Sequence, residues 1–166
     1  IAAAAAGISW MAVEWMLRGR PSLLGLISGA VGGLVVITPA SGFVGPVAAL
    51  IMGLVGGVCC FWGAVVLKRW AGWDDSLDAF GVHVVGGIVG AILTGVFATS
   101  AVTGTDMNPV MTQVGIQATS VLATIVYAGA VNWILLKIVD KVIGLRVTAD
   151  DERMGLNLSL HGERIE

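Results

Sequence analysis

The two histidines are the residues of this chain whose chemistry depends most on their surroundings. His83 lies inside the apolar stretch FGVHVVGG, whereas His161 lies in the polar C-terminal tail, where we expect a surface residue. An ionisable group inside an apolar membrane segment usually faces a cavity, a pathway or a partner. Desolvation favours the neutral imidazole, whose one donor and one acceptor nitrogen suit a small, polar, uncharged guest. On position alone, a histidine packed against a neighbouring helix fits equally well.

Asp78 stands five residues before His83, in DDSLDAFGVH, where a helix is expected to begin. An aspartate at a helix start accepts hydrogen bonds from free N–H groups and complements the helix dipole. We therefore predict a structural role for Asp78 near the site of His83, in preference to direct substrate contact. Asp74 and Asp75 are expected to be solvated loop residues.

Other reactive side chains are sparse. Glu14 lies one turn before Arg18, which predicts an i,i+4 ion pair. Cys59 and Cys60 are neighbours in an apolar run and are expected to act as small hydrophobic residues. The sequence has no HExxH, no CxxC, no phosphate loop and no serine–histidine pair at a recognisable spacing. It therefore predicts no enzyme, no cofactor and no metal site, because one buried histidine supplies too few ligands.

The composition indicates a lipid environment for the elements that carry these residues. The chain is 57% hydrophobic and 12% charged, with a mean hydropathy of +0.92, whereas soluble domains carry about 25% charged residues. The 24 glycines fit helices whose backbones approach closely in a bilayer. We expect an all-α, polytopic membrane helix bundle. The lipid bilayer is its expected partner, and no nucleic acid is expected to bind.

Hydrophilic breaks divide the chain into five apolar segments, predicted as spans at about 1–17, 23–38, 45–67, 80–102 and 109–143. A spanning helix needs roughly 20 apolar residues. The third and fourth segments satisfy that length, while the fifth, at about 35 residues and roughly 50 Å, has to tilt or extend beyond the bilayer.

The basic residues are confined to alternate breaks. All nine fall in the first, third and last hydrophilic stretches: Arg18, Arg20, Lys68, Arg69, Lys137, Lys141, Arg146, Arg153 and Arg164. Five spans place those stretches on one side of the membrane, and the positive-inside rule assigns that side to the cytoplasm. Residues 144–166 are therefore predicted to form a cytoplasmic tail, either a disordered end or a regulatory and docking segment.

Three stretches resemble the ammonium transporters of the Amt/Mep/Rh family. The segment GLISGAVGGLVVITPASGFVGPVAALIMGLVGGVCCFWGAVVLKR is similar to a bacterial family region that ends a helix at an ITPA-type turn. DAFGVHVVGGIVGAILTG resembles the segment that carries the second histidine of the family's twin-histidine pore, and GLRV with SLHGE resembles the family tail. The resemblance covers essentially all 166 residues.

The resemblance implies the second inverted repeat and the long final helix of an eleven-helix fold, helices seven to eleven. It implies a homotrimer in the cell inner or plasma membrane, with one narrow pore per protomer. Ammonium would be deprotonated on entry, and ammonia would pass along the pore histidines. His83 matches the second of these; Thr38 and Ser28 are carried as further pore or substrate residues.

The family's vestibule and its first pore histidine would precede Ile1. The apolar start IAAAAAGISWMAVEWML is typical of the middle of a helix. The resemblance therefore implies a missing N-terminal half of the same protein as a partner, and a PII-type regulator as a candidate partner of the tail. Three alternatives stay open: an ammonium sensor of the same fold, another repeat-built secondary transporter, and an intramembrane enzyme. The enzyme is least favoured, because no nucleophile accompanies His83.

Overall fold

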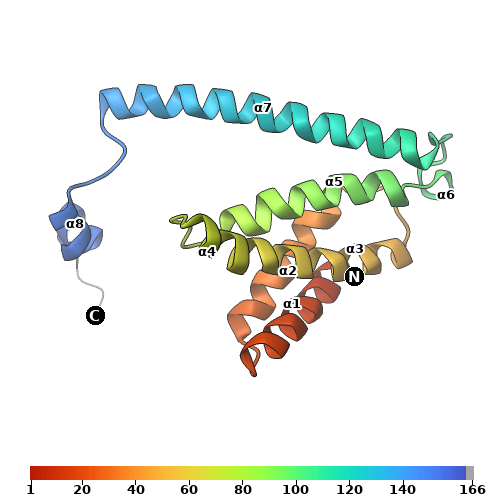
Figure 1. Ribbon diagram of the computed structural model, residues 1–166, viewed down its shortest axis with the longest axis horizontal. Coiled ribbons are helices and arrows are strands. Elements are labelled where there is room, and N and C mark those ends of the chain that lie inside the picture. Colours follow the sequence, from red (N-terminus) through yellow and green to blue (C-terminus); the bar gives the residue numbers. More distant parts are fainter. Residues whose placement is uncertain (164–166) are drawn as a thin grey trace. The chain divides into compact units, whose positions relative to one another are not determined.

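The computed structural model describes residues 1–163, and every regular element among them is a helix. This agrees with the predicted all-α class. The chain divides into two compact units, Ile1–Leu122 and Ala123–Glu166, and Figure 1 shows the order of the helices along it. The elements that position His83 all belong to the first unit.

The first two helices form a hairpin whose turn falls in the first basic break. Helix α1 (Ala2–Arg18) ends at Gly19, whose φ of 74° is the left-handed conformation that glycine adopts without strain. Helix α2 (Leu23–Ile37) starts after Ser22, whose Oγ accepts a hydrogen bond of 2.9 Å from the backbone N–H of Gly25.

The second and third predicted segments are also helical, with local changes of winding. Helix α2 passes into the 3₁₀ turn η1 (Thr38–Ala40), where Pro39 ends the α-helical pattern as expected. Helix α3 (Pro46–Phe61) continues through the π-helical segment η2 (Trp62–Leu67) into α4 (Lys68–Ala71). A second π-helical segment, η3 (Phe80–Val85), opens α5 (Gly86–Phe97).

The fourth segment is shorter than the predicted 80–102. Helix α5 stops at Phe97, and the short helix α6 (Ser100–Thr103) follows after a break. At the break, the backbone N–H of Thr99 bonds the carbonyl of Phe43 at 3.0 Å, in the loop before α3. Residues 98–102 read ATSAV and contain no charged residue, proline or glycine, so the sequence pattern did not reveal this long-range bond.

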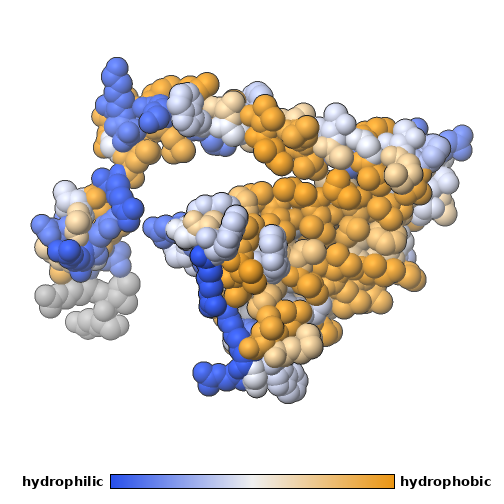
Figure 2. Space-filling model, in the orientation of Figure 1, coloured by the Kyte–Doolittle hydropathy of each residue, from blue (hydrophilic) through white to orange (hydrophobic). Residues whose placement is uncertain are grey.

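The core of the first unit lies between α1, α2, α3 and the η3–α5 helix. Its buried side chains are Trp10, Val36, Ala40, Met52, Cys60, Phe61, Ala64 and Val82. Trp10 and Phe61 meet edge to face, with ring centroids 5.5 Å apart. Outside this core the unit stays apolar: Figure 2 shows a mostly hydrophobic surface over α3 and α5, as a helix bundle in lipid requires.

Four helices in the described residues are long and apolar enough to cross a membrane: Leu23–Ala40, Pro46–Ala71, Phe80–Phe97 and Val110–Val142. The last of these is α7, 33 residues long, which corresponds to the predicted segment 109–143. Helix α1, at 17 residues, is not among the four.

The second unit contains the polar tail. Helix α8 (Ala149–Met154) is capped by Thr148, whose Oγ accepts from the N–H of Asp151, and α9 (Leu156–His161) follows directly. Arg146 Nε lies 2.6 Å from Glu152 Oε1, and this hydrogen bond holds the pKa of the Glu152 carboxyl below its usual range. Of the two alternatives for the tail, a disordered end does not describe residues 149–161, which form two short helices.

Candidate functional site

His83 lies on an apolar groove in the first unit. The groove has a volume of about 510 Å³ and is lined by Val35, Thr38, Pro39, His83 and Gly87. These residues come from the end of α2, the turn η1 and the η3–α5 helix, three pieces that pack against one another. The groove therefore brings together two of the predicted site residues, His83 and Thr38, from positions 45 residues apart in the chain.

The imidazole of His83 is solvent-accessible on this side of the chain, and it makes no hydrogen bond to any of residues 1–163. A neutral imidazole there keeps one donor and one acceptor nitrogen free for a guest in the groove. The alternative reading, a histidine bonded to a neighbouring helix, has no such bond within the described part of the chain.

The hydroxyl of Thr38 donates a hydrogen bond of 2.7 Å to the carbonyl of Leu34, one turn earlier. Its proton is therefore engaged, and its oxygen keeps acceptor capacity toward the groove. A guest with N–H groups fits this arrangement, because Thr38 can accept a hydrogen bond while His83 can accept or donate one.

Ser28 does not line this groove. It lies on α2 ten residues before Thr38, which corresponds to roughly 15 Å along the helix axis. Its role at a conduit stays a prediction from the resemblance alone.

The helix start before His83 is built differently from the prediction. The carboxylate of Asp75, not that of Asp78, caps it: Oδ1 accepts from the N–H of Ala79 and Oδ2 from that of Phe80, each at 2.9 Å. Asp78 instead forms an ion pair with Lys68 across the loop. The expectations that Asp78 caps and that Asp75 is merely solvated are therefore wrong. Three aspartates in DDSLDAF all stand within reach of the helix start, and spacing cannot decide among them.

His83 lies in one of two π-helical segments that cross each other. The segments η2 and η3 approach closely at Gly63 and Gly81, where a Cβ at Gly63 would stand 2.9 Å from the Cα of Gly81. Beside this crossing, the Sγ of Cys60 donates a hydrogen bond of 3.7 Å to the carbonyl of Val82. π-Helical turns inside α-helices occur frequently at functional sites. Both segments consist almost entirely of apolar residues, WGAVVL and FGVHVV, so the sequence offers no periodic signal that could have revealed them.

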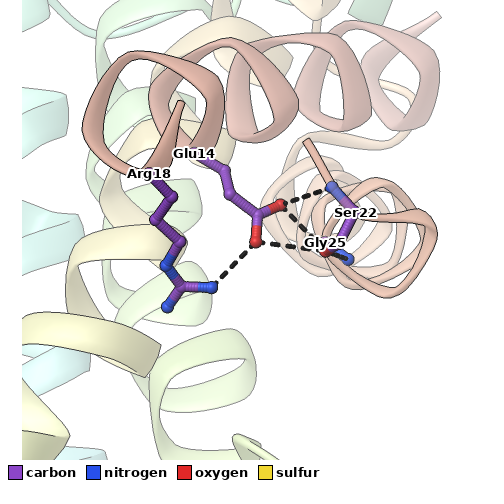
Figure 3. Close-up of polar contacts among 4 residues, drawn as sticks. All are labelled: Glu14, Arg18, Ser22 and Gly25. Atoms are coloured by element: carbon purple, nitrogen blue, oxygen red, sulfur yellow. Dashed lines mark hydrogen bonds and ion pairs between the residues drawn. The ribbon is translucent and has the colours of Figure 1, made fainter. Parts of the chain in front are cut away.

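A second polar cluster lies in the hairpin of α1 and α2 (Figure 3). Glu14 is only 3% exposed, and its carboxylate pairs with Arg18 Nη1 at 2.8 Å, which confirms the predicted i,i+4 ion pair. The same carboxylate also accepts from the N–H and the Oγ of Ser22. It leaves no room for a side chain at position 25, where a Cβ on Gly25 would overlap with Glu14 Oε2.

Comparison with known proteins shows similarity along nearly the whole chain. The Ammonium Transporter Family profile matches residues 1–165. An ammonium transporter of Bacillus subtilis is 45% identical over 98% of this chain and 41% of its own length. The ammonium transporter Amt1 of Archaeoglobus fulgidus is 41% identical over 97% of this chain and 41% of its own length.

Solved structures of ammonium transporter relatives are also similar to this chain. The crystal structure of Saccharomyces cerevisiae Mep2 is similar with a TM-score of 0.81 and 37% identity, over 90% of this chain and 36% of Mep2. A structure described as a sensor Amt protein is similar with a TM-score of 0.87 and 31% identity, over 96% of this chain and 39% of that one.

The chain spans about two fifths of the length of the curated relatives it matches. What it shares with them is the C-terminal portion, including the apolar helices of a multi-pass membrane protein. The family match over residues 1–165, together with relatives above 40% identity, shows that this chain belongs to the ammonium transporter family.

Proposed function

We propose that the complete protein moves ammonium or ammonia across the cell membrane through a narrow apolar conduit, and that His83 supplies one of the imidazoles along it. The observation that carries this proposal is the groove that His83 and Thr38 share. Its other lining residues are Val35, Pro39 and Gly87, so the groove is polar only at the two side chains suited to bind a small N–H guest.

The physical chemistry of the groove favours an uncharged guest. An ammonium ion loses a large hydration energy in an apolar passage, whereas ammonia loses far less. We infer that ammonium gives up a proton on entry and that ammonia passes His83, whose nitrogens orient it and relay a proton. The entry site and a second imidazole belong, on this proposal, to the part of the protein that precedes Ile1.

The same proposal includes the assembly and its orientation. The family resemblance supports a homotrimer with one conduit per protomer, and the confinement of Lys and Arg to alternate breaks supports a cytoplasmic tail. A PII-type protein is the proposed partner of that tail. In the tail, the charged helix α8 presents Asp150, Asp151 and Glu152 in its first turn.

An ammonium sensor is the second candidate function, and one observation favours it. The sensor Amt protein matches this chain with a TM-score of 0.87 over 96% of its residues. A sensor would use the same groove to bind ammonium and the tail to signal. Ammonium flux into proteoliposomes that contain the complete protein separates the two, since binding without flux supports the sensor.

The substitution His83→Ala tests the role of the imidazole. We expect ammonium-driven current in proteoliposomes to fall at least about tenfold, because a proton relay by a positioned side chain contributes on the order of 10² or more. His161→Ala, in the tail, is the matched control and is expected to leave the current unchanged. Equal currents in the wild type and His83→Ala would contradict the proposal.

A further inference from the structure

The cation of Lys68 joins two points of the loop that leads to His83. Its Nζ donates a hydrogen bond of 2.7 Å to the backbone carbonyl of Asp75 and forms an ion pair with the carboxylate of Asp78. The side chains of Lys68 and Asp78 are 28% and 30% exposed, so the pair is largely shielded from solvent. We refer to Lys68, Asp75 and Asp78 as the loop clamp.

Each aspartate of the loop clamp is tied to the start of η3. The carboxylate of Asp75 caps the first two N–H groups, those of Ala79 and Phe80. The carbonyl of Asp78 accepts from the N–H of Val82 at 2.9 Å, and Val82 immediately precedes His83. A displacement of either aspartate therefore moves the turn of backbone that carries the imidazole.

Asp78 also holds a backbone conformation that needs support. Its φ is 55°, and it is the one residue other than glycine with a positive φ in the described part of the chain. The left-handed region is unfavourable for an ordinary residue, although aspartate and asparagine tolerate it better than most. The ion pair with Lys68 stabilises this turn. Trp73, in the same loop, packs edge to face on Phe80, with ring centroids 4.4 Å apart.

The first turn of η3 is also held on its packed side, so it has little freedom to compensate. The backbones of η2 and η3 meet at Gly63 and Gly81, and Cys60 bonds the carbonyl of Val82. The segment is therefore fixed on one side by packing and at its start by the loop clamp. The position of His83 in the groove depends on both.

We propose that Lys68 is a positioning residue for His83: by holding Asp75 and Asp78 it fixes the start of η3 and so places the imidazole in the groove beside Thr38. This inference rests on the proposed function, because transport is the activity that a displaced imidazole would impair. Lys68 does not line the groove and acts only through the backbone of η3.

Four substitutions in the complete protein test the inference. Lys68→Met removes the cation and keeps the length of the side chain. Asp78→Asn removes the anion but keeps a residue that tolerates a positive φ. Lys68→Arg is the conservative rescue. Arg69→Met is the matched control, because Arg69 is an exposed neighbouring cation that makes no polar contact with any residue from 1 to 163.

The measurement is ammonium flux per folded protein in proteoliposomes, with the folded fraction taken from size-exclusion chromatography. Lys68→Met and Asp78→Asn are expected to lower the maximal flux about tenfold, since small misplacements of a reacting group have effects of this order or larger. The ammonium concentration that gives half-maximal flux should stay unchanged, because the proposed entry site, where ammonium first binds, does not include Lys68 or Asp78. The double variant should lose no more than either single variant, and Lys68→Arg should restore most of the flux.

The outcomes separate this inference from the proposed function. If His83→Ala lowers the flux while Lys68→Met behaves like Arg69→Met, the loop clamp has no positioning role and the proposed function stands. Losses that multiply in the double variant, or that vanish once flux is expressed per folded protein, would also overturn the inference. If His83→Ala itself leaves the flux unchanged, the proposed role of His83 is wrong, and the positioning role of Lys68, which rests on it, is wrong as well.

Discussion

At the scale of single residues, the carboxylates of Glu14 and Asp78 are wholly or partly removed from water, and each is matched by a cation. Glu14 is paired with Arg18, and Asp78 with Lys68. A buried carboxylate without a partner would carry a large desolvation cost, so the local cation is what makes each position tolerable. The two differ in what they hold: Glu14 joins α1 to α2, whereas Asp78 belongs to the loop that precedes His83.

The substitution Glu14→Ala is expected to lower the stability of the protein by about 2 kcal/mol, because the N–H and hydroxyl of Ser22 lose their acceptor. Thermal unfolding in detergent measures the effect. Glu14→Gln keeps one acceptor oxygen and should lose about half as much. A variant Glu14→Ala with the unfolding midpoint of the wild type would show that the cluster contributes nothing to stability.

At the scale of elements, the π-helical segments decide how closely α3 and α5 approach. Gly63 and Gly81 let the two backbones meet at the crossing, because a Cβ at Gly81 would stand 2.7 Å from the carbonyl carbon of Gly63. The close approach buries Ala64 and Val82 on either side of the crossing. It also leaves His83, next in the chain, on the groove side of η3.

The substitution Gly81→Ala tests this crossing. Its Cβ would stand within 2.5 Å of the Cα of Ala64, so the two segments have to separate, and we expect a loss of about 1–3 kcal/mol in stability. Gly87→Ala is the control for stability, because a Cβ there meets nothing within 4 Å. Equal unfolding midpoints for the two variants would show that the crossing is not tightly packed.

At the scale of the whole molecule, the apolar surface and the distribution of charge together indicate how the chain sits in a bilayer. Helix α7 alone extends over 33 residues, and none of its side chains is buried within the described structure. An apolar helix of this kind needs lipid or further protein around it. The positive-inside rule predicts an orientation for the chain, with the loop that contains Thr105 outside and the tail inside.

This orientation predicts the reactivity of introduced cysteines. In intact cells, a membrane-impermeant maleimide should label Thr105→Cys, in the loop before α7, but not Asp150→Cys, in α8. Permeabilised cells should show labelling at both positions. Cys59 and Cys60 lie within the membrane segment of α3, so the unsubstituted protein supplies the background. Labelling of Asp150→Cys in intact cells would show the opposite orientation and contradict the predicted cytoplasmic tail.

Much of the fold followed from the sequence because the bilayer imposes simple rules. Long apolar runs separated by charged breaks predict helices, and α2, α3 and α7 begin within one residue of the predicted segments. His83 was selectable for a similar reason, since it is an isolated ionisable residue in an apolar stretch. Thr38 followed only from the family resemblance.

Several features of the site depended on contacts that no local pattern records. The break at Thr99 comes from a bond to Phe43, more than fifty residues away. The choice of Asp75 as the cap, and of Asp78 as the partner of Lys68, depends on how the loop folds back on α4. The sequence offered three equivalent aspartates.

The sequence by itself determined that this chain is a set of membrane-embedded helices of the ammonium transporter family, because hydropathy, charge placement and motif order are properties of the chain alone. Only the tertiary structure decided that His83 and Thr38 face one groove, and that Lys68 reaches the loop before His83. The physical reason is that winding and close approach of two helices depend on both backbones at once. The sequence of a single segment does not specify the backbone of the helix against which it packs.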